Sequence, residues 1–153
     1  MSKTDKVKHY LEQGYNCGQA IMAAFAEDYG MTTEAMMKLS FNLGGGLGFQ
    51  GGICGALSSA LLIYGLQFGS DQPNDELPCE VVYQLSMAHI GKFSDTFGTT
   101  QCKELLGYDI SNPDDFERIM EDDLFQLKCV RFIIESVRIL EHNISETKKK
   151  IQY

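Results

Sequence analysis

Four cysteines are the residues of this chain best able to do chemistry, and three of them stand where a helix is expected to begin. Cys17 follows an asparagine of the kind that caps helices, Cys54 follows a glycine-rich run, and Cys102 follows a short polar segment. At a helix start, unpaired backbone N–H groups and the positive end of the helix dipole stabilise a thiolate over a thiol. The placement therefore predicts lowered thiol pKa values, which suit both redox chemistry and metal ligation.

The fourth cysteine, Cys129, lies inside a long apolar helical pattern. Like Cys17 and Cys54, it falls on the apolar face of its helix, so three cysteines from different helices are predicted to face inward. No CxxC pair occurs, and neither a thioredoxin-type dithiol nor a zinc ribbon is indicated. A site built from four distant segments would have to be assembled by the fold, and the spacing leaves open whether it holds a metal.

Composition favours one soluble globular domain over residues 1–153, with an apolar content of 44% and a charged content of 22%. A formal net charge of -8 argues against binding to nucleic acid or to an anionic membrane surface, because both need basic residues. No signal segment and no apolar run long enough for membrane insertion is visible. We therefore expect a cytoplasmic protein with reduced thiols, in which cysteines bind metal, catalyse or pack rather than form a disulfide framework.

Helical periodicity dominates the chain, strand signals are scarce, and the predicted fold is an all-α, single-domain helical bundle. A glycine-rich loop precedes an almost wholly apolar helix that is too hydrophobic for the surface, so we expect a buried central helix. Residues 70–78 are expected to form a loop. The expected helices cover residues 7–11, 17–29, 33–39, 53–68, 80–97 and 102–106, with one beginning at Pro113 and a last one carrying residues 125–140.

The glycine-rich loop contains a GxGxxG match between Gly46 and Gly51. A dinucleotide-binding fingerprint needs a strand before it, whereas residues 34–43 have a helical pattern, so nucleotide binding is disfavoured. The glycines are expected to allow close packing, to form a concavity of N–H groups suited to thiolates, cluster sulfides or an oxyanion, or to do both. The backbone predicted to surround the site belongs to Gly45, Gly46, Gly48, Gly51 and Gly52.

Four segments, residues 16–20, 44–48, 54–58 and 97–102, together resemble the redox-active family C_GCAxxG_C_C, which is named for four cysteines and a central CGAxxG segment. The resemblance extends over about residues 14–140. It implies that the family's cysteines correspond to Cys17, Cys54, Cys102 and Cys129, and that these thiols are redox-active. Ser59 stands where the family has the last glycine of CGAxxG, and Cys79 lies outside the pattern and is interpreted as incidental.

The leading hypothesis is a redox centre in which the four cysteines bind an iron–sulfur cluster, or another thiolate-held metal, for electron transfer. A redox partner protein or a small electron carrier would then be required. Met31, Met36 and Met37 are expected to fill the core or to form a contact surface, such as that of a homodimer. The alternatives are thiol–disulfide chemistry with Cys54 as nucleophile, a structural zinc site, and a non-catalytic helical binding protein whose cysteines only pack. His89 is expected to be a hydrogen-bonded core residue rather than a ligand.

Overall fold

The computed structural model describes residues 1–151, and these residues form eight α-helices and no strand, as the helical sequence pattern predicts. The predicted all-α fold is confirmed. The α-helices are α1 (Lys3–Glu12), α2 (Cys17–Ala24), α3 (Thr33–Leu39), α4 (Gly55–Phe68), α5 (Glu76–Phe97), α6 (Cys102–Leu106), α7 (Pro113–Glu121) and α8 (Val130–Ile151). Two 3-10 turns, η1 (Ala26–Tyr29) and η2 (Phe41–Leu43), and one π-helical turn, η3 (Phe125–Cys129), complete the set.

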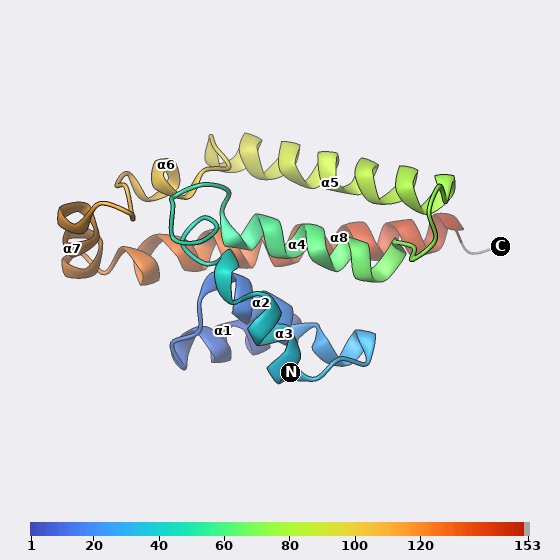
Figure 1. Ribbon diagram of the computed structural model, residues 1–153, viewed down its shortest axis with the longest axis horizontal. Helices are drawn as coiled ribbons and strands as arrows, with labels where there is room; N and C mark the ends of the chain where they lie inside the picture. Colours follow the sequence, from blue (N-terminus) through green and yellow to red (C-terminus); the bar gives the residue numbers. More distant parts are fainter. Residues whose placement is uncertain (152–153) are drawn as a thin grey trace.

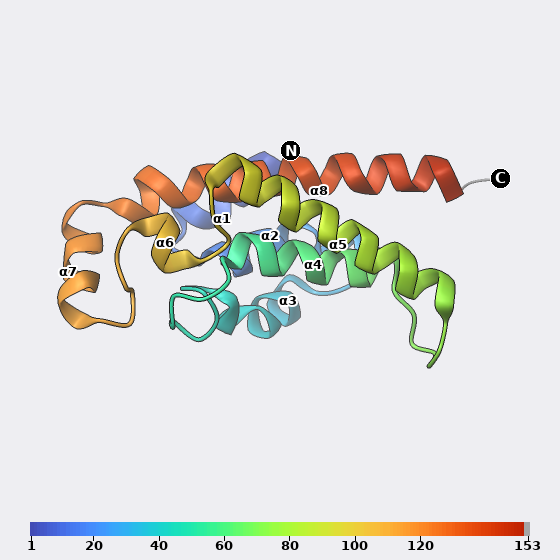
Figure 2. The ribbon, with the colours of Figure 1, turned by 90° about the horizontal axis from the view of Figure 1, so that it is seen from above.

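The long helices α4 and α8 run side by side through the middle of the molecule (Figures 1 and 2). In Figure 1, α5 lies above this pair and α1 to α3 lie below it. The glycine-rich loop, α6 and α7 gather at the end where α4 begins. The elements that carry the four candidate cysteines therefore meet at one end of the fold. No helix within residues 1–151 is both long and apolar enough to span a membrane.

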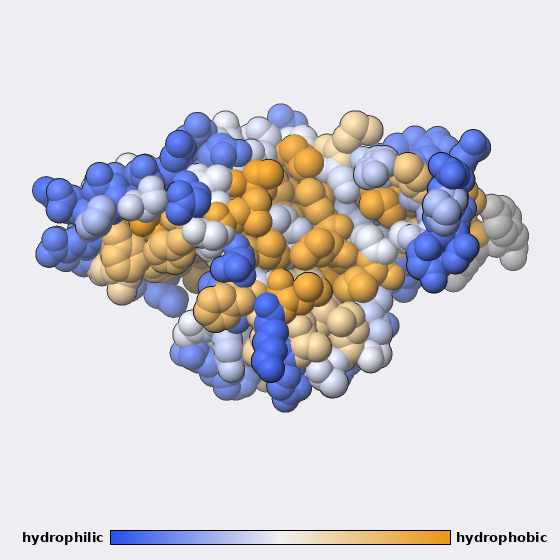
Figure 3. All heavy atoms as spheres, in the orientation of Figure 1, coloured by the Kyte–Doolittle hydropathy of each residue, from blue (hydrophilic) through white to orange (hydrophobic). Residues whose placement is uncertain are grey.

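Helix α4 occupies the centre of the fold because it has apolar residues on all sides and no charged residue. It packs against α2, α5 and α8, and Leu57, Ile63 and Tyr64 are fully or almost fully buried. Its outer side is open, with Leu62 and Leu66 exposed by 42% and 41%. Figure 3 shows this outer side as part of an apolar face. The central placement agrees with the sequence, but burial is confined to the inner side of the helix.

A chain of buried hydrogen bonds joins α4, α5 and α8. The Ser136 hydroxyl donates to the Ala56 carbonyl oxygen (2.7 Å), so the Ser136 oxygen accepts from Nε2 of His89 (2.9 Å). Nδ1 of His89 then carries no hydrogen and accepts from the Tyr64 hydroxyl (2.7 Å), whose oxygen accepts from the Asn143 amide (2.9 Å). The expectation that His89 is a hydrogen-bonded core residue is confirmed, and the network fixes α8 against the first turn of α4.

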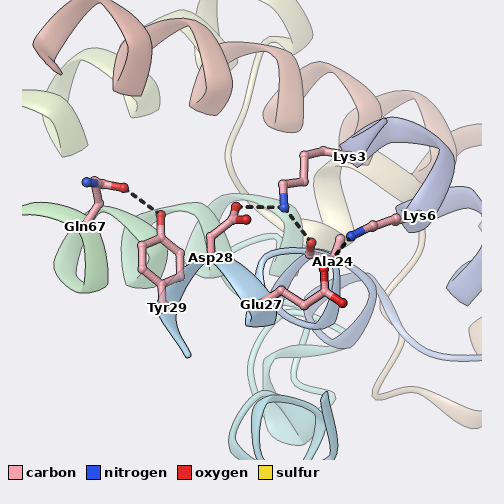
Figure 4. A network of polar contacts seen from close by, with 7 residues as sticks. All are labelled: Lys3, Lys6, Ala24, Glu27, Asp28, Tyr29 and Gln67. Carbon is pink, nitrogen blue, oxygen red and sulfur yellow. Dashed lines mark hydrogen bonds and ion pairs between the residues drawn. The ribbon is translucent and has the colours of Figure 1, made fainter. Parts of the chain in front are cut away.

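Polar contacts attach the N-terminal helix to the rest of the fold (Figure 4). Nζ of Lys3 forms an ion pair with Asp28 (2.7 Å) and donates to the carbonyl oxygen of Ala24 (3.0 Å) at the end of α2. Tyr29 in turn donates to the Gln67 side chain of α4 (3.1 Å). Partly exposed ion pairs contribute little free energy, so these contacts mainly fix where α1 and η1 lie.

Several predicted helix boundaries differ from the structure, and the first helix already begins at Lys3 rather than at Val7. The second helix ends at Ala24 and not at Gly30, because the chain tightens into η1, whose C-cap is Gly30 in the left-handed conformation. Helix α5 begins at Glu76, inside the predicted loop, because Pro78 lies in its first turn, where a missing N–H costs nothing. The last predicted helix is divided into η3 and α8.

Candidate functional site

Three of the four candidate cysteines stand at helix starts, as the sequence predicts. Cys17 is the first residue of α2, Cys54 is the N-cap of α4, and Cys102 is the first residue of α6. The start of α2 is fixed by a reciprocal capping box between Asn16 and Gln19 (3.0 and 3.2 Å). Each of these thiols is therefore held by the same local structure that begins its helix.

A single antiparallel bridge brings Cys54 and Cys102 together. The bridge pairs Ile53 with Gln101, and the residues on either side complete it. The Cys54 N–H donates to the Thr100 carbonyl (2.8 Å), and the Cys102 N–H donates to the Gly52 carbonyl (2.6 Å). Two cysteines that are 48 residues apart in the sequence are thereby fixed next to one another by main-chain hydrogen bonds.

Cys129 is the last residue of the π-helical turn η3, directly before α8. Short π-helical turns are rare and often occur at functional sites. Lys128, in the same turn, donates from Nζ to the carbonyl oxygen of Leu106 at the end of α6 (3.2 Å). This contact attaches η3 to the short helix that begins with Cys102.

All four cysteines line one cavity of about 430 Å³ at this end of the fold. Cys79 does not belong to it, because it is exposed on the first turn of α5. Apart from the thiols, the lining is mainly aliphatic and aromatic and includes Phe49 and Phe116, whose ring centroids are 5.7 Å apart. The structure thus assembles the four distant segments around a shared space, and their chemical role stays a prediction.

The glycines of the loop have different roles from one another. Gly45 lines the cavity, and the carbonyls of Gly51 and Gly52 accept hydrogen bonds from the first residues of α6. Gly46 has a φ of 74°, and a Cβ there would collide with the backbone of Gly51 and Gly52. Gly48 also has a positive φ, but open space surrounds it. Close packing therefore accounts for Gly46, and only Gly45 of the five predicted glycines borders the cavity.

Gly55 and Ser59 explain how the central CGAxxG-like segment packs. A Cβ on Gly55 would collide with Sγ of Cys17 and with the Leu43 carbonyl oxygen. Ser59 is fully buried, and its hydroxyl donates to the Gly55 carbonyl (2.6 Å). The serine thus satisfies its own polar group within the helix, and close packing is retained without the family's glycine.

Burial raises the pKa of all four thiols, so the lowered values expected from the helix starts are wrong for the free thiols. It raises the pKa of Cys102 to about 12, with the charge of Cys17 as a second cause. The pKa of Cys17 is also raised by burial, which outweighs the N–H groups of Gly18 and Gly45 near its sulfur. For Cys54, burial and then the neighbouring Cys17 raise the pKa well above its usual range. The cavity therefore holds neutral thiols at neutral pH.

The side chains do not form a ready chelate for one metal ion. Among residues 1–151, no group of three or more His, Cys, Asp or Glu side chains is arranged so that it could hold a metal ion. A closed zinc site needs four such ligands around a single point. The four cysteines share a cavity without converging to that degree.

Alkylation of the reduced, metal-free protein is expected to label Cys79 first and the cavity thiols at least about a hundredfold more slowly at neutral pH. Cys79 is exposed, whereas a thiol such as Cys102, with a pKa of about 12, is thiolate in only about one molecule in 100,000 at pH 7. Mass mapping of iodoacetamide-labelled peptides over time measures the rates. Labelling of Cys54 as fast as Cys79 would contradict the burial argument.

These features define a class: an all-α protein with four buried or half-buried cysteines around one cavity at the end of its central helices. The sequence profile of the family described as "Putative redox-active protein (C_GCAxxG_C_C)" matches residues 15–143, and the chain belongs to that family. The family is named for redox activity. The chain matches no curated protein and no solved structure.

Sequence reasoning missed the residues that form the walls of the cavity. Phe49 lies in the glycine-rich loop with a φ of 64°, and Phe116 lies on the inner side of α7. A lone phenylalanine between glycines gave no periodic signal, because it belongs to no helix. The strongly amphipathic pattern of α7, with Phe116 on its apolar side, was the one signal that could have placed it near the site.

Proposed function

We propose that the protein transfers electrons through an iron–sulfur cluster held by Cys17, Cys54, Cys102 and Cys129. The observation that carries this proposal is that all four cysteines, supplied by four separate segments, line one cavity. Four thiolates are the usual ligand set of such a cluster, which would supply one-electron chemistry when bound.

The number of the thiols, and the lack of a single-ion arrangement among residues 1–151, favour a polynuclear cluster over a single ion. A single ion needs its ligands around one point, and no such group occurs within residues 1–151. In an iron–sulfur cluster the four cysteines are distributed over two or more irons, so their thiolates lie further apart than the thiolates around a single ion. Side chains that border one cavity without converging fit the second arrangement better.

The neutral state of the free thiols also supports ligation over disulfide exchange. An attacking cysteine must be a thiolate, and burial keeps Cys54 protonated at neutral pH. Metal ligation removes that proton as part of binding, so a raised pKa makes binding pH-dependent without preventing it. Backbone N–H groups of Gly18, Gly45 and Gly55 near the Cys17 sulfur would stabilise its ligating thiolate and influence the reduction potential.

Exchange of electrons requires a redox partner protein or a small electron carrier. The exposed cavity-lining residues Phe49 and Met120, which are 46% and 54% exposed, mark the side from which a carrier would approach. A reducing compartment such as the cytoplasm would keep the four thiols available for ligation.

Anaerobically purified protein is expected to be brown, with iron and acid-labile sulfide in comparable amounts. The Cys54→Ser variant should lose most of its iron, because it removes a ligand, whereas Cys79→Ser should retain the full amount, because Cys79 is exposed and away from the cavity. The measurements are metal and sulfide analysis and the visible absorption spectrum before exposure to air.

Two results would overturn this proposal. A colourless protein without sulfide, whose free-thiol count falls by two or four on mild oxidation, would establish the thiol–disulfide alternative. Equal iron content in the Cys54 and Cys79 variants would show that the iron is bound elsewhere.

A further inference from the structure

We propose that the four-cysteine cavity also binds an uncharged, flat aromatic molecule beside the thiols. The inference rests on the proposed function only in that both use the same cavity. It adds a ligand class, and it assigns no reaction to that ligand. Three features of the cavity carry it: its volume, the chemistry of its walls, and its opening to solvent.

The cavity has more empty space than a group bound at the four sulfurs would fill. A cavity of about 150 Å³ lined by apolar side chains is large enough to hold benzene. The present cavity of about 430 Å³ is almost three times as large and falls in the range of small-molecule sites. There is room for a two-ring molecule in addition to a group bound at the sulfurs.

The walls select for an uncharged aromatic ligand. No charged side chain of the described residues lines the cavity, so a charged ligand would lose its hydration without gaining a partner. Aromatic rings come from three different segments, with Phe49 from the loop, Phe116 from α7 and Phe125 from η3. Rings in such positions stack against a flat ligand. Tyr15 and Gln126 are also lining residues, and they carry the hydroxyl and amide donors that a ligand oxygen would need.

The cavity is open to solvent next to these rings. Phe49 and Met120 both line it and remain about half exposed. Phe49 has a φ of 64°, which is unfavourable for a residue other than glycine, and its ring lies where a Cβ on Gly45 would be. The glycine at position 45 thus allows the loop to place an aromatic ring at the opening.

Equilibrium dialysis of the anaerobically isolated protein against 1-naphthol and against 1-naphthoate tests this inference. The two probes have the same ring system and differ in charge at neutral pH. One equivalent of 1-naphthol is expected to bind, with an affinity at least about tenfold above that of 1-naphthoate.

A larger side chain at the opening of the cavity should weaken the binding of 1-naphthol. Met120→Trp places a large side chain at the opening and is expected to weaken 1-naphthol binding about tenfold or more. Met87→Trp is the matched control, because Met87 is also exposed, by 66%, but lies on α5 away from the cavity. The helical circular dichroism signal of both variants verifies that they fold.

The outcomes separate this inference from the proposed function. Equal affinity for the two probes, or an unchanged affinity in Met120→Trp, overturns the inference. Iron-containing protein that binds 1-naphthol only after its metal is removed also overturns it, since the probe would then occupy the metal's space. Protein that lacks iron but binds 1-naphthol with the expected selectivity supports the inference and counts against the iron–sulfur cluster alone.

Discussion

Gly55→Ala is expected to lower the free energy of unfolding by about 2 kcal/mol, although alanine is the better helix former. The added Cβ would lie against Sγ of Cys17 and only 2.7 Å from the Leu43 carbonyl oxygen. The Leu43 oxygen is a backbone atom that cannot turn aside, so α4 must move away from η2 and from the start of α2. Because Cys54 precedes Gly55 directly, the same shift should separate Cys17 from Cys54 and weaken binding of the proposed cluster.

Gly65→Ala is the matched control, because it makes the same change almost three turns further along α4. Nothing lies within 4 Å of a Cβ at Gly65. Because no clash opposes the higher helix propensity of alanine at this position, we expect the free energy of unfolding to rise by up to about 1 kcal/mol. Urea unfolding of the wild type and both variants measures the difference. If both variants gained the same stability, Gly55 would not be packed against Cys17 as described.

The helix starts at three cysteines could be predicted from the sequence because the signals are local. Asn16 caps α2 through its own side chain, and glycine stops the preceding helical patterns. The placement of Cys17 and Cys54 on the inner faces of their helices followed from the helical period. The antiparallel bridge between Ile53 and Gln101 could not be predicted in the same way, since it joins two segments with no strand pattern.

The direction of the thiol pKa shifts was predicted wrongly for a definite physical reason. A helix start lowers a thiol pKa only through nearby N–H groups and a partial charge, and both effects are small beside the loss of hydration in an apolar cavity. At Cys17, N–H groups of Gly18 and Gly45 do lower the pKa, but burial raises it more. The sequence indicates where a helix starts, whereas burial depends on all the elements that close over it.

The stability of the protein is expected to fall by about 3 kcal/mol as the pH is lowered from about 6.5 to 4, because of His89. Burial, and secondarily the charge of Lys92, lowers the pKa of His89 from 6.5 to about 4 in the folded protein. Between these pH values the unfolded chain binds a proton that the folded chain does not. Acidification therefore favours unfolding, and the loss is complete once the pH is below about 4.

His89→Gln removes this titration and should flatten the dependence of the unfolding free energy on pH between 6.5 and 4. The variant is expected to be less stable than the wild type at neutral pH, because Tyr64 and Ser136 lose a hydrogen-bond partner. His142→Gln, on the exposed side of α8, is the matched control for the substitution itself. Urea unfolding at a series of pH values measures all three slopes. If His89→Gln kept the wild-type slope, His89 would have to take up a proton on Nδ1 in the folded protein. Nδ1 could then not accept the hydrogen bond from the Tyr64 hydroxyl, and the hydrogen-bond directions given above would be wrong.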